Sequence, residues 1–395
     1  MSKHLILALV VLAASTAAAC TSEPAAPAPR TEAPRSDTDR ESTTLYGLDV
    51  VDAKTAFAFG LNDYDFTGSI VLKTSDGGET WRSVLHADRS EFVGLDFADA
   101  NKGVAITDGG AAFVTSDGGE TWTAVSDSTL FERRYQAPSP AIGAPTAPQS
   151  GPVELAGIFF AGALDGWTFG SRDESKPGAA PNRLDTVTRP VVVRTSDGGA
   201  TWKELTVPAE APAVAFRRGF FADAKSGVLV GGDIDDETGV VARTSDGGAT
   251  WSIVTPASKQ IPTDVFFVDA SRGWLVGFTE DASGDAGPTD ILTTADGGQT
   301  WTVQSRVPTS LRAIRFADPQ NGWAVGARGK IFRTTDGGAT WVEQSTQNWT
   351  TGKTVEVEDP LFGDDDSPTF AGFQLLTPNR GWAAGDVGVY EYKGR

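Results

Sequence analysis

The sequence predicts an all-β fold, a seven-bladed β-propeller, on three observations. The octet TSDGGETW at 74–81 recurs unchanged at 115–122, with near copies at 195–202, 244–251, 294–301 and 334–341. The copies follow one another at about 40 residues or more, which is the period of a propeller blade with insertions. Each copy lies among four short runs of strand-forming residues, and no helical period occurs. Four-stranded units repeated in this way are typical of a propeller.

Each unit is expected to contain four strands, A to D. Strand A is apolar, strand B begins at Gly-Trp, strand C is β-branched, and strand D begins at the Thr-Trp of the octet. Because an unpaired sheet edge favours aggregation, we expect a strand from around residues 31–42 to complete the last blade; three strands are the alternative. Units begin near Leu45, Phe92, Leu155, Val214, Thr263 and Leu311, and a seventh, at 370–394, stops after strand C.

The octet lies between strands C and D and predicts a hairpin turn. An Asp carboxylate accepts hydrogen bonds from turn amides, Gly takes positive φ freely, and Trp covers the hairpin with a large apolar face. A catalytic group is rarely needed six times around a ring, so we interpret the octets as structural. The residues concerned are Asp76, Asp117, Asp197, Asp246, Asp296 and Asp336, with Trp81, Trp122, Trp202, Trp251, Trp301 and Trp341.

The pattern Ser/Thr-x-Asp-Gly-Gly-x-Thr-Trp resembles the Asp-box, or BNR repeat, of sialidases, some glycoside hydrolases, sortilin-type receptors and the photosystem II stability/assembly factor family. The last family is similar over roughly residues 45–394. It also combines one seven-bladed propeller, an Asp-box in most blades, a Gly-Trp-Ala-Val-Gly strand and often a lipoprotein signal. The resemblance implies a non-catalytic module that engages a protein partner, such as a subunit of a membrane complex under assembly. The motif is specific for the fold and much less so for one function.

The N-terminus predicts export. Residues 1–20 read as a signal peptide of lipoprotein type, because the apolar run is too short to span a bilayer and Ala17-Ala18-Ala19-Cys20 resembles a bacterial lipobox. Lipidation of Cys20 would anchor the protein in the bacterial cell envelope, and cleavage that leaves a secreted protein is the alternative. Residues 21–44 are expected to form a disordered tether, and 45–395 the propeller.

Composition limits the chemistry. The net charge of -19 argues against nucleic acid as a partner. One cysteine and, after the signal peptide, one histidine argue against Ser-His-Asp or Cys-His nucleophiles and against His/Cys metal sites. Glycosidases need only carboxylates, so a carbohydrate-active hydrolase of sialidase/BNR type is the alternative function. We expect no cofactor and no bound metal, although acidic loops at 63–67, 233–237 and 364–366 offer oxygen ligands for Ca²⁺.

Antiparallel topology puts the A–B and C–D turns on one face of the ring. The long insertions then lie on the other face, which we take as the working face. Aligned strands A bring Asp49, Asp96, Phe159, Phe220, Phe266, Arg315 and Gln374 into one column around the axial channel. Arg315 with Arg217, Arg218 and Arg312 makes a basic island, and the resemblance implies that an arginine patch engages a client; ion pairs between blades are the alternative. We expect a monomer whose partner contacts Arg217, Arg218, Arg312, Arg315, Phe159, Phe220 and Phe266.

Overall fold

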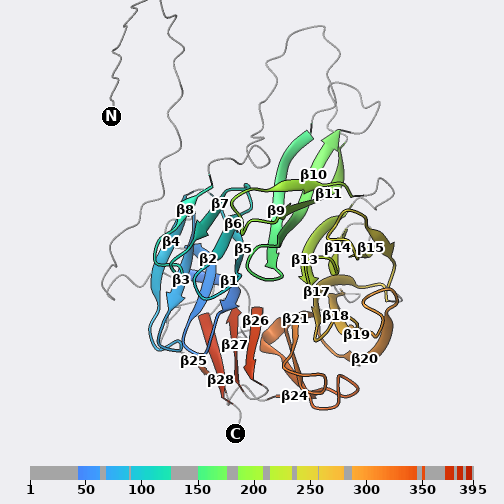
Figure 1. Cartoon of the computed structure of the whole chain (residues 1–395). Helices are drawn as coiled ribbons and strands as arrows, with labels where there is room; N and C mark the ends of the chain where they lie inside the picture. The colour runs from blue at the N-terminus through green and yellow to red at the C-terminus, as the bar shows by residue number, and fades with distance from the viewer. Residues whose placement is uncertain are drawn as a thin grey trace, which may run out of the picture.

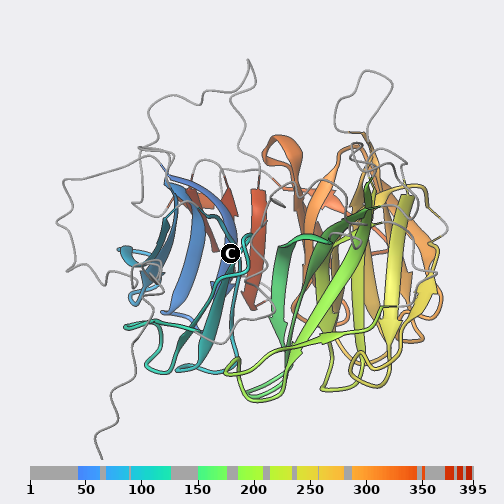
Figure 2. The same cartoon turned by 90° about the horizontal axis from the view of Figure 1, so that it is seen from above.

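Seven four-stranded antiparallel sheets surround a central axis in the computed structural model (Figure 1). The strands run from one face of the ring to the other (Figure 2). The predicted all-β, seven-bladed propeller is thereby confirmed. The structure describes residues 43–62, 68–88, 90–125, 150–175, 186–207, 214–233, 238–256, 258–279, 287–344, 349–351, 370–377, 380–385 and 388–393.

Blades 1 to 6 each use four consecutive strands. Blade 1 has β1 (Thr43–Val50), β2 (Ala56–Asn62), β3 (Gly68–Thr74) and β4 (Arg82–Asp88). Blade 2 has β5 (Phe92–Phe97), β6 (Gly103–Thr107), β7 (Ala112–Thr115) and β8 (Thr123–Ala124), and blade 3 has β9 (Ser150–Phe160), β10 (Gly166–Ser175), β11 (Thr186–Thr195) and β12 (Lys203–Leu205). Blade 4 has β13 (Ala215–Phe221), β14 (Gly227–Asp233), β15 (Thr238–Thr244) and β16 (Ser252–Val254).

The remaining blades follow the same plan up to the last. Blade 5 has β17 (Ile261–Phe267), β18 (Gly273–Phe278), β19 (Thr289–Thr294) and β20 (Thr302–Val307). Blade 6 has β21 (Leu311–Phe316), β22 (Gly322–Gly326), β23 (Ile331–Thr334) and β24 (Val342–Glu343), with a 3₁₀ turn at Ala327–Gly329. Blade 7 has β26 (Phe370–Thr377), β27 (Arg380–Gly385), β28 (Gly388–Lys393) and, from upstream, β25 (Trp349–Thr351).

Burial follows position within the blade. The second strands β6 and β22 are buried at every residue, because neighbouring blades cover both faces of each sheet. The outermost strand β20 is mostly exposed. The core is therefore a set of apolar layers between blades.

Aromatic side chains fill these layers. Trp167 of blade 3 stacks on Phe221 of blade 4 with ring centroids 3.7 Å apart, and Trp274 of blade 5 stacks on Phe316 of blade 6 at 3.6 Å. The octet residue Trp341 then meets Phe316 edge-on at 5.9 Å. Phe221 and Phe316, which end their strands A, are thus each held between a tryptophan of the preceding blade and the octet tryptophan of their own.

Blade 7 is completed by β25, which pairs antiparallel with β28 through Trp349 opposite Tyr392 and Thr351 opposite Tyr390. The expectation of a three-stranded last blade is therefore wrong. The prediction that residues 31–42 supply the fourth strand of blade 7 is also wrong, since β25 occupies that place in the sheet. Residues 31–42 themselves lie outside the described part of the chain. The physical reason is that Trp-Thr-Thr is rich in β-formers and close in sequence to the blade, so it closes a much shorter loop.

The ring closes between blades 7 and 1 by side-chain packing. Strand β1 packs against β26 and β27. Trp81 of the first octet lies edge-on to Trp382 with ring centroids 5.8 Å apart. No strand is shared between the chain ends within the described residues, so these contacts and the polar ones described below hold the seam.

Candidate functional site

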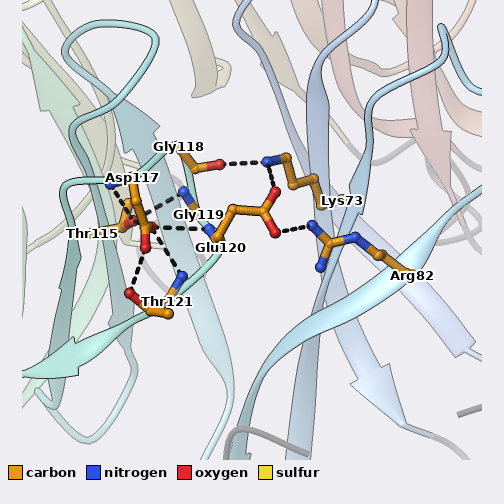
Figure 3. Close-up of polar contacts among 8 residues, drawn as sticks. All are labelled: Lys73, Arg82, Thr115, Asp117, Gly118, Gly119, Glu120 and Thr121. Atoms are coloured by element: carbon orange, nitrogen blue, oxygen red, sulfur yellow. Dashed lines mark hydrogen bonds and ion pairs between the residues drawn. The ribbon is translucent and has the colours of Figure 1, made fainter. Parts of the chain in front are cut away.

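The octets form C–D hairpin turns that are braced by their own side chains. In the second octet, Asp117 Oδ1 accepts hydrogen bonds from the Thr115 hydroxyl (2.8 Å) and the Thr121 amide (2.9 Å), while Oδ2 accepts from the Thr121 hydroxyl (2.6 Å; Figure 3). Gly118 and Gly119 have φ values of 70° and 78°, which glycine adopts without strain. The same three contacts recur in the other five octets.

These hydrogen bonds favour the ionised carboxylate. The Thr121 hydroxyl, followed by the Thr121 amide, lowers the pKa of Asp117 to about 2. The pKa falls to about 2 in the same way at Asp76, Asp246, Asp296 and Asp336, and is also lowered at Asp197. A carboxylate with such a low pKa and this many hydrogen-bond donors suits a turn brace and is a poor proton donor near neutral pH.

Each octet is also tied to the A–B turn of its own blade. The Gly118 amide donates to the Asn101 carbonyl at 2.8 Å, and the equivalent bond occurs in all six blades that carry an octet. The A–B and C–D turns therefore share one face of the ring, as predicted. Strand ends that lead to the long insertions lie on the opposite face, while most residues of the insertions lie outside the described ranges.

A further brace links blades 1 and 2 beside the second octet. Lys73 Nζ donates to the Gly118 carbonyl (2.7 Å) and to Glu120 Oε1 (2.6 Å), and Arg82 reaches Glu120 Oε2 at 2.6 Å (Figure 3). The Lys73 side chain is only 7% exposed, whereas Arg82 and Glu120 are 41% and 51% exposed. Later blades repeat the contact, from Arg194 to the Gly247 carbonyl and from Arg243 to the Gly297 carbonyl.

Sequence reasoning missed a second set of repeated aspartates, in the A–B turns. Asp99 Oδ1 accepts from the Asn101 and Lys102 amides, both at 2.8 Å. These bonds lower the pKa of Asp99. The signal was available, because an Asp stands at the same offset before strand B in five blades, at Asp52, Asp99, Asp223, Asp269 and Asp318.

The innermost strands enclose an axial channel of about 280 Å³. All seven strands A contribute to it, and the predicted column lines it in full: Asp49, Asp96, Phe159, Phe220, Phe266, Arg315 and Gln374. The pairing register explains the alignment. In blades 1 to 6 each member lies opposite the second residue of strand B, as Phe159 does opposite Trp167, and in blade 7 Gln374 lies opposite Trp382, the third residue of β27.

One arc of the channel, in blades 7, 1 and 2, is polar. Gln374 Oε1 accepts from the Val50 amide (2.6 Å), Asp49 Oδ2 from the Phe97 amide (2.9 Å) and Asp96 Oδ2 from the Phe160 amide (2.5 Å). Gln374 Nε2 also donates to Asp49 Oδ1 at 3.1 Å. Strand A is a sheet edge, so its inward amides have no strand partner, and each polar side chain satisfies one amide of the next blade.

The two carboxyl groups of this arc titrate abnormally. Burial raises the pKa of Asp49 to about 6, against the opposing effect of its hydrogen bonds. Burial and then repulsion from Asp49 raise the pKa of Asp96 well above the ordinary value. The pKa values of the octet aspartates and of Asp49 and Asp96 thus shift in opposite directions. Hydrogen-bond donors dominate at the octets, whereas desolvation dominates at Asp49 and Asp96.

The remaining arc is aromatic and basic. Phe159 and Phe220 lie with ring centroids 5.1 Å apart, and Phe220 and Phe266 at 5.6 Å. The Arg315 guanidinium lies over Phe266 at 5.6 Å and forms an ion pair with the buried Asp264, a contact between blades 6 and 5. For Arg315 the structure therefore shows the second of the two predicted roles, an ion pair between blades.

Arg218 also lines the channel, but it donates to the carbonyls of Ala156 (3.3 Å) and Arg217 (3.0 Å) and to no carboxylate within the described part of the chain. Burial lowers the pKa of its guanidinium even though the Asp264 charge opposes the effect. Arg218 and Arg315 are thus the interior members of the predicted basic island.

Arg217 and Arg312 both occupy β-bulges, and neither is among the residues that line the channel. Every strand A has such a bulge, at Tyr46, Val93, Ala156, Arg217, Thr263, Arg312 and Ala371, and β9 and β26 each have a second register shift. Burial and then repulsion from Arg217 lower the pKa of Arg312, whose guanidinium lies over the Phe278 ring at 5.6 Å. We call Arg217 and Arg312 the basic rim. Neither forms an ion pair with a carboxylate of the described residues.

Several predicted features lie outside the described residues: the lipidation site Cys20, the tether up to residue 42, and the acidic loop positions 63–67, 234–237 and 364–366. The predicted boundary between tether and propeller is two residues too late, because β1 begins at Thr43. Across the described ranges, no group of three or more His, Cys, Asp or Glu side chains is placed to hold a metal ion. No helix in those ranges has the length and apolar character to span a bilayer.

The sequence matches no protein family and no curated protein. By structure, it is similar to YCF48 bound to D1 peptide, with a TM-score of 0.56 and 16% identity over 90% of this chain and 94% of that one. YCF48 from Cyanidioschyzon merolae gives a TM-score of 0.55 and 15% identity over 90% and 96%. The GH74 enzyme of Niastella koreensis gives 0.44 and 12% over 86% and 62%. At these identities the likeness is one of fold, and this chain is a β-propeller that resembles YCF48.

Proposed function

We propose that this protein is a non-catalytic binding module of the bacterial cell envelope, which engages a protein partner through the basic rim. The observation that carries the proposal is the pair Arg217 and Arg312, two neighbouring cations with no described counter-ion in a protein of net charge -19. Two like charges held together cost free energy in the unbound protein. An acidic segment of a partner would relieve that repulsion on binding.

The fold supports this proposal. YCF48, whose fold is similar, has been solved bound to a D1 peptide. A peptide of a membrane-complex subunit is thus a reasonable class of partner, and a lipid anchor at Cys20 would hold the propeller beside such a complex. The proposal therefore includes export, lipidation of Cys20 and a role in assembly.

The contacts of the channel carboxylates favour a structural role for these groups over a catalytic role in a carbohydrate-active hydrolase. A glycosidase needs one carboxyl group free to donate a proton and another free to attack or to activate water. Asp49, Asp96 and Asp264 each accept a backbone amide of the following blade, and Asp264 is also paired with Arg315. These contacts give all three a role in joining strands A.

The test is binding of the mature protein to an array of overlapping peptides from the envelope proteins of its native host. Replacing both rim cations, with Arg217→Gln and Arg312→Gln, should weaken binding to acidic peptides at least about tenfold, because charge-assisted contacts are lost. Arg272→Gln, on an exposed turn of the octet face, is the matched control and should have no effect. Peptide binding that survives the double replacement at full strength would contradict the proposal.

A further inference from the structure

Beyond the rim, the channel interior carries opposite charges on opposite walls. Asp49 and Asp96 lie on strands A of blades 1 and 2, while Arg218, Asp264 and Arg315 lie on those of blades 4, 5 and 6. In a ring of seven blades these two sets face each other across the axis (Figure 1). The three phenylalanines Phe159, Phe220 and Phe266 belong to blades 3, 4 and 5, so they extend from beside the acidic wall to the basic wall.

The acidic wall retains a negative charge near neutral pH. Asp49 and Asp96 repel each other, and their raised pKa values mean that the two groups lose their protons in separate steps. Asp49, whose pKa is raised to about 6, is mostly ionised at pH 7, so the wall carries negative charge. The Asp96 carboxylate accepts from the Phe160 amide through Oδ2 and also interacts with the Phe97 backbone amide. An ionised carboxylate has about four acceptor sites, so Asp96 can accept from a further donor.

The basic wall retains a positive charge. Asp264 is 3% exposed and forms its ion pair with Arg315, which neutralises one of the two guanidinium groups. Among the described residues, Arg218 donates hydrogen bonds to two backbone carbonyls, both from Nη1. The guanidinium has five N–H donors, so Arg218 keeps donors for a carboxylate in the channel.

The space between the walls suits a small molecule. Sites for drug-sized ligands usually measure about 300–1,000 Å³. The channel, at about 280 Å³, lies just below that range. Phe159, Phe220 and Phe266 are half-buried and present ring surface to it.

We propose that the axial channel binds a small zwitterion, an α-amino acid with an apolar or aromatic side chain. Its ammonium group contacts Asp49 and Asp96, its carboxylate contacts Arg218, and its side chain packs on the phenylalanine arc. A molecule with one charge of each sign matches both walls at once and leaves neither buried charge uncompensated. This inference does not depend on a protein partner at the rim.

The test is calorimetric titration of the mature protein at pH 7 with L-phenylalanine and L-leucine. Two comparators each lack one charge of phenylalanine: phenethylamine has only the ammonium group, and 3-phenylpropionate has only the carboxylate. We expect saturable binding of at least one amino acid, and binding of each comparator at least about tenfold weaker, since each leaves one wall unpaired.

Two variants test whether the acidic wall binds the ammonium group and the basic wall binds the carboxylate. Asp96→Asn keeps an oxygen for the Phe160 amide, and Arg218→Gln keeps a polar side chain. Each should weaken amino-acid binding at least about tenfold, whereas Arg272→Gln, on an exposed turn of the octet face, should not. Circular dichroism and melting would establish that each variant is folded. The proposal would be overturned by any of three results: no heat of binding with either amino acid, binding of the comparators as tight as that of phenylalanine, or folded Asp96 and Arg218 variants that bind like wild type. None of these results affects the outcome of the rim experiment.

Discussion

The octet face and the axial channel are produced by the same repeat, but the repeat is uniform at one and varied at the other. Six octets make the same hydrogen bonds from threonine and backbone to an Asp carboxylate. At the equivalent channel positions stand three phenylalanines, two aspartates, one arginine and one glutamine. Turn braces can be identical because every blade needs the same support. Recognition needs different groups at defined places, so the varied ring is where we place function.

The largest loss of stability is expected from a substitution in the apolar layers between blades, which support both the octet face and the channel. Trp274 is 1% exposed, stacks on Phe316 and donates from Nε1 to the Gly337 carbonyl at 3.2 Å. Trp274→Ala should lower the free energy of unfolding by about 3–5 kcal/mol, because a large buried side chain leaves a cavity. Chemical denaturation would measure the loss. The half-buried Trp341 is the control, and an equal or larger loss from Trp341→Ala would contradict this order.

A single exchange, Asp to Asn, should separate the two regions. Asp296→Asn removes an oxygen that accepts from the Thr300 hydroxyl and should cost about 1–2 kcal/mol, because these are hydrogen bonds to a charged group. Asp96→Asn keeps the acceptor for the Phe160 amide and removes repulsion with Asp49, so stability at pH 7 should be unchanged or higher. Denaturation midpoints at pH 7 test the difference. Equal losses in the two variants would show that the regions are not distinct.

The pH dependence of stability should have two opposite limbs. The octet carboxyls have folded pKa values lowered to about 2 at Asp76, Asp117, Asp246, Asp296 and Asp336, so their contribution is present above pH 4 and lost as pH falls toward 2. Asp49 has a folded pKa raised to about 6, so its contribution is present below pH 4 and lost as pH rises through 6. Melting temperatures from pH 2 to 7 would show both limbs. In Asp49→Asn the upper limb should flatten while the lower limb persists. An unchanged upper limb would contradict the assignment of that limb to Asp49.

The smallest effect is expected at the surface part of the blade 1–2 brace. Arg82 and Glu120 are both largely exposed, so Arg82→Gln should cost no more than about 0.5 kcal/mol. Lys73 is buried and also donates to the Gly118 carbonyl, so Lys73→Gln should cost more. Denaturation in low and high salt would compare the two. A larger loss of stability from Arg82→Gln than from Lys73→Gln would contradict the view that the buried part of this brace contributes more than the exposed part.

The sequence predicts the octet turns well because their contacts span at most four residues, as from Asp117 to Thr121. The channel column could also be predicted, since strand A alternates in a regular way. The division of the arginines could not be predicted, because the sequence pattern does not reveal the one-residue bulge at Arg217; Arg218 lines the channel and Arg217 does not. Asp264 was missed because its partner Arg315 is 51 residues away. The short strand β25 was missed because three residues give almost no local signal.

The most direct measurement is thermal melting of Asp96→Asn and Asp296→Asn, each with and without L-phenylalanine at pH 7. A ligand that binds only the folded protein raises its melting temperature. We predict that Asp296→Asn melts earlier than wild type and keeps the full shift with phenylalanine. Asp96→Asn should melt at or above the wild-type temperature and lose the shift. The reverse pattern, in which the octet variant loses the shift and the channel variant keeps it, would contradict the assignment of support to the octets and recognition to the channel.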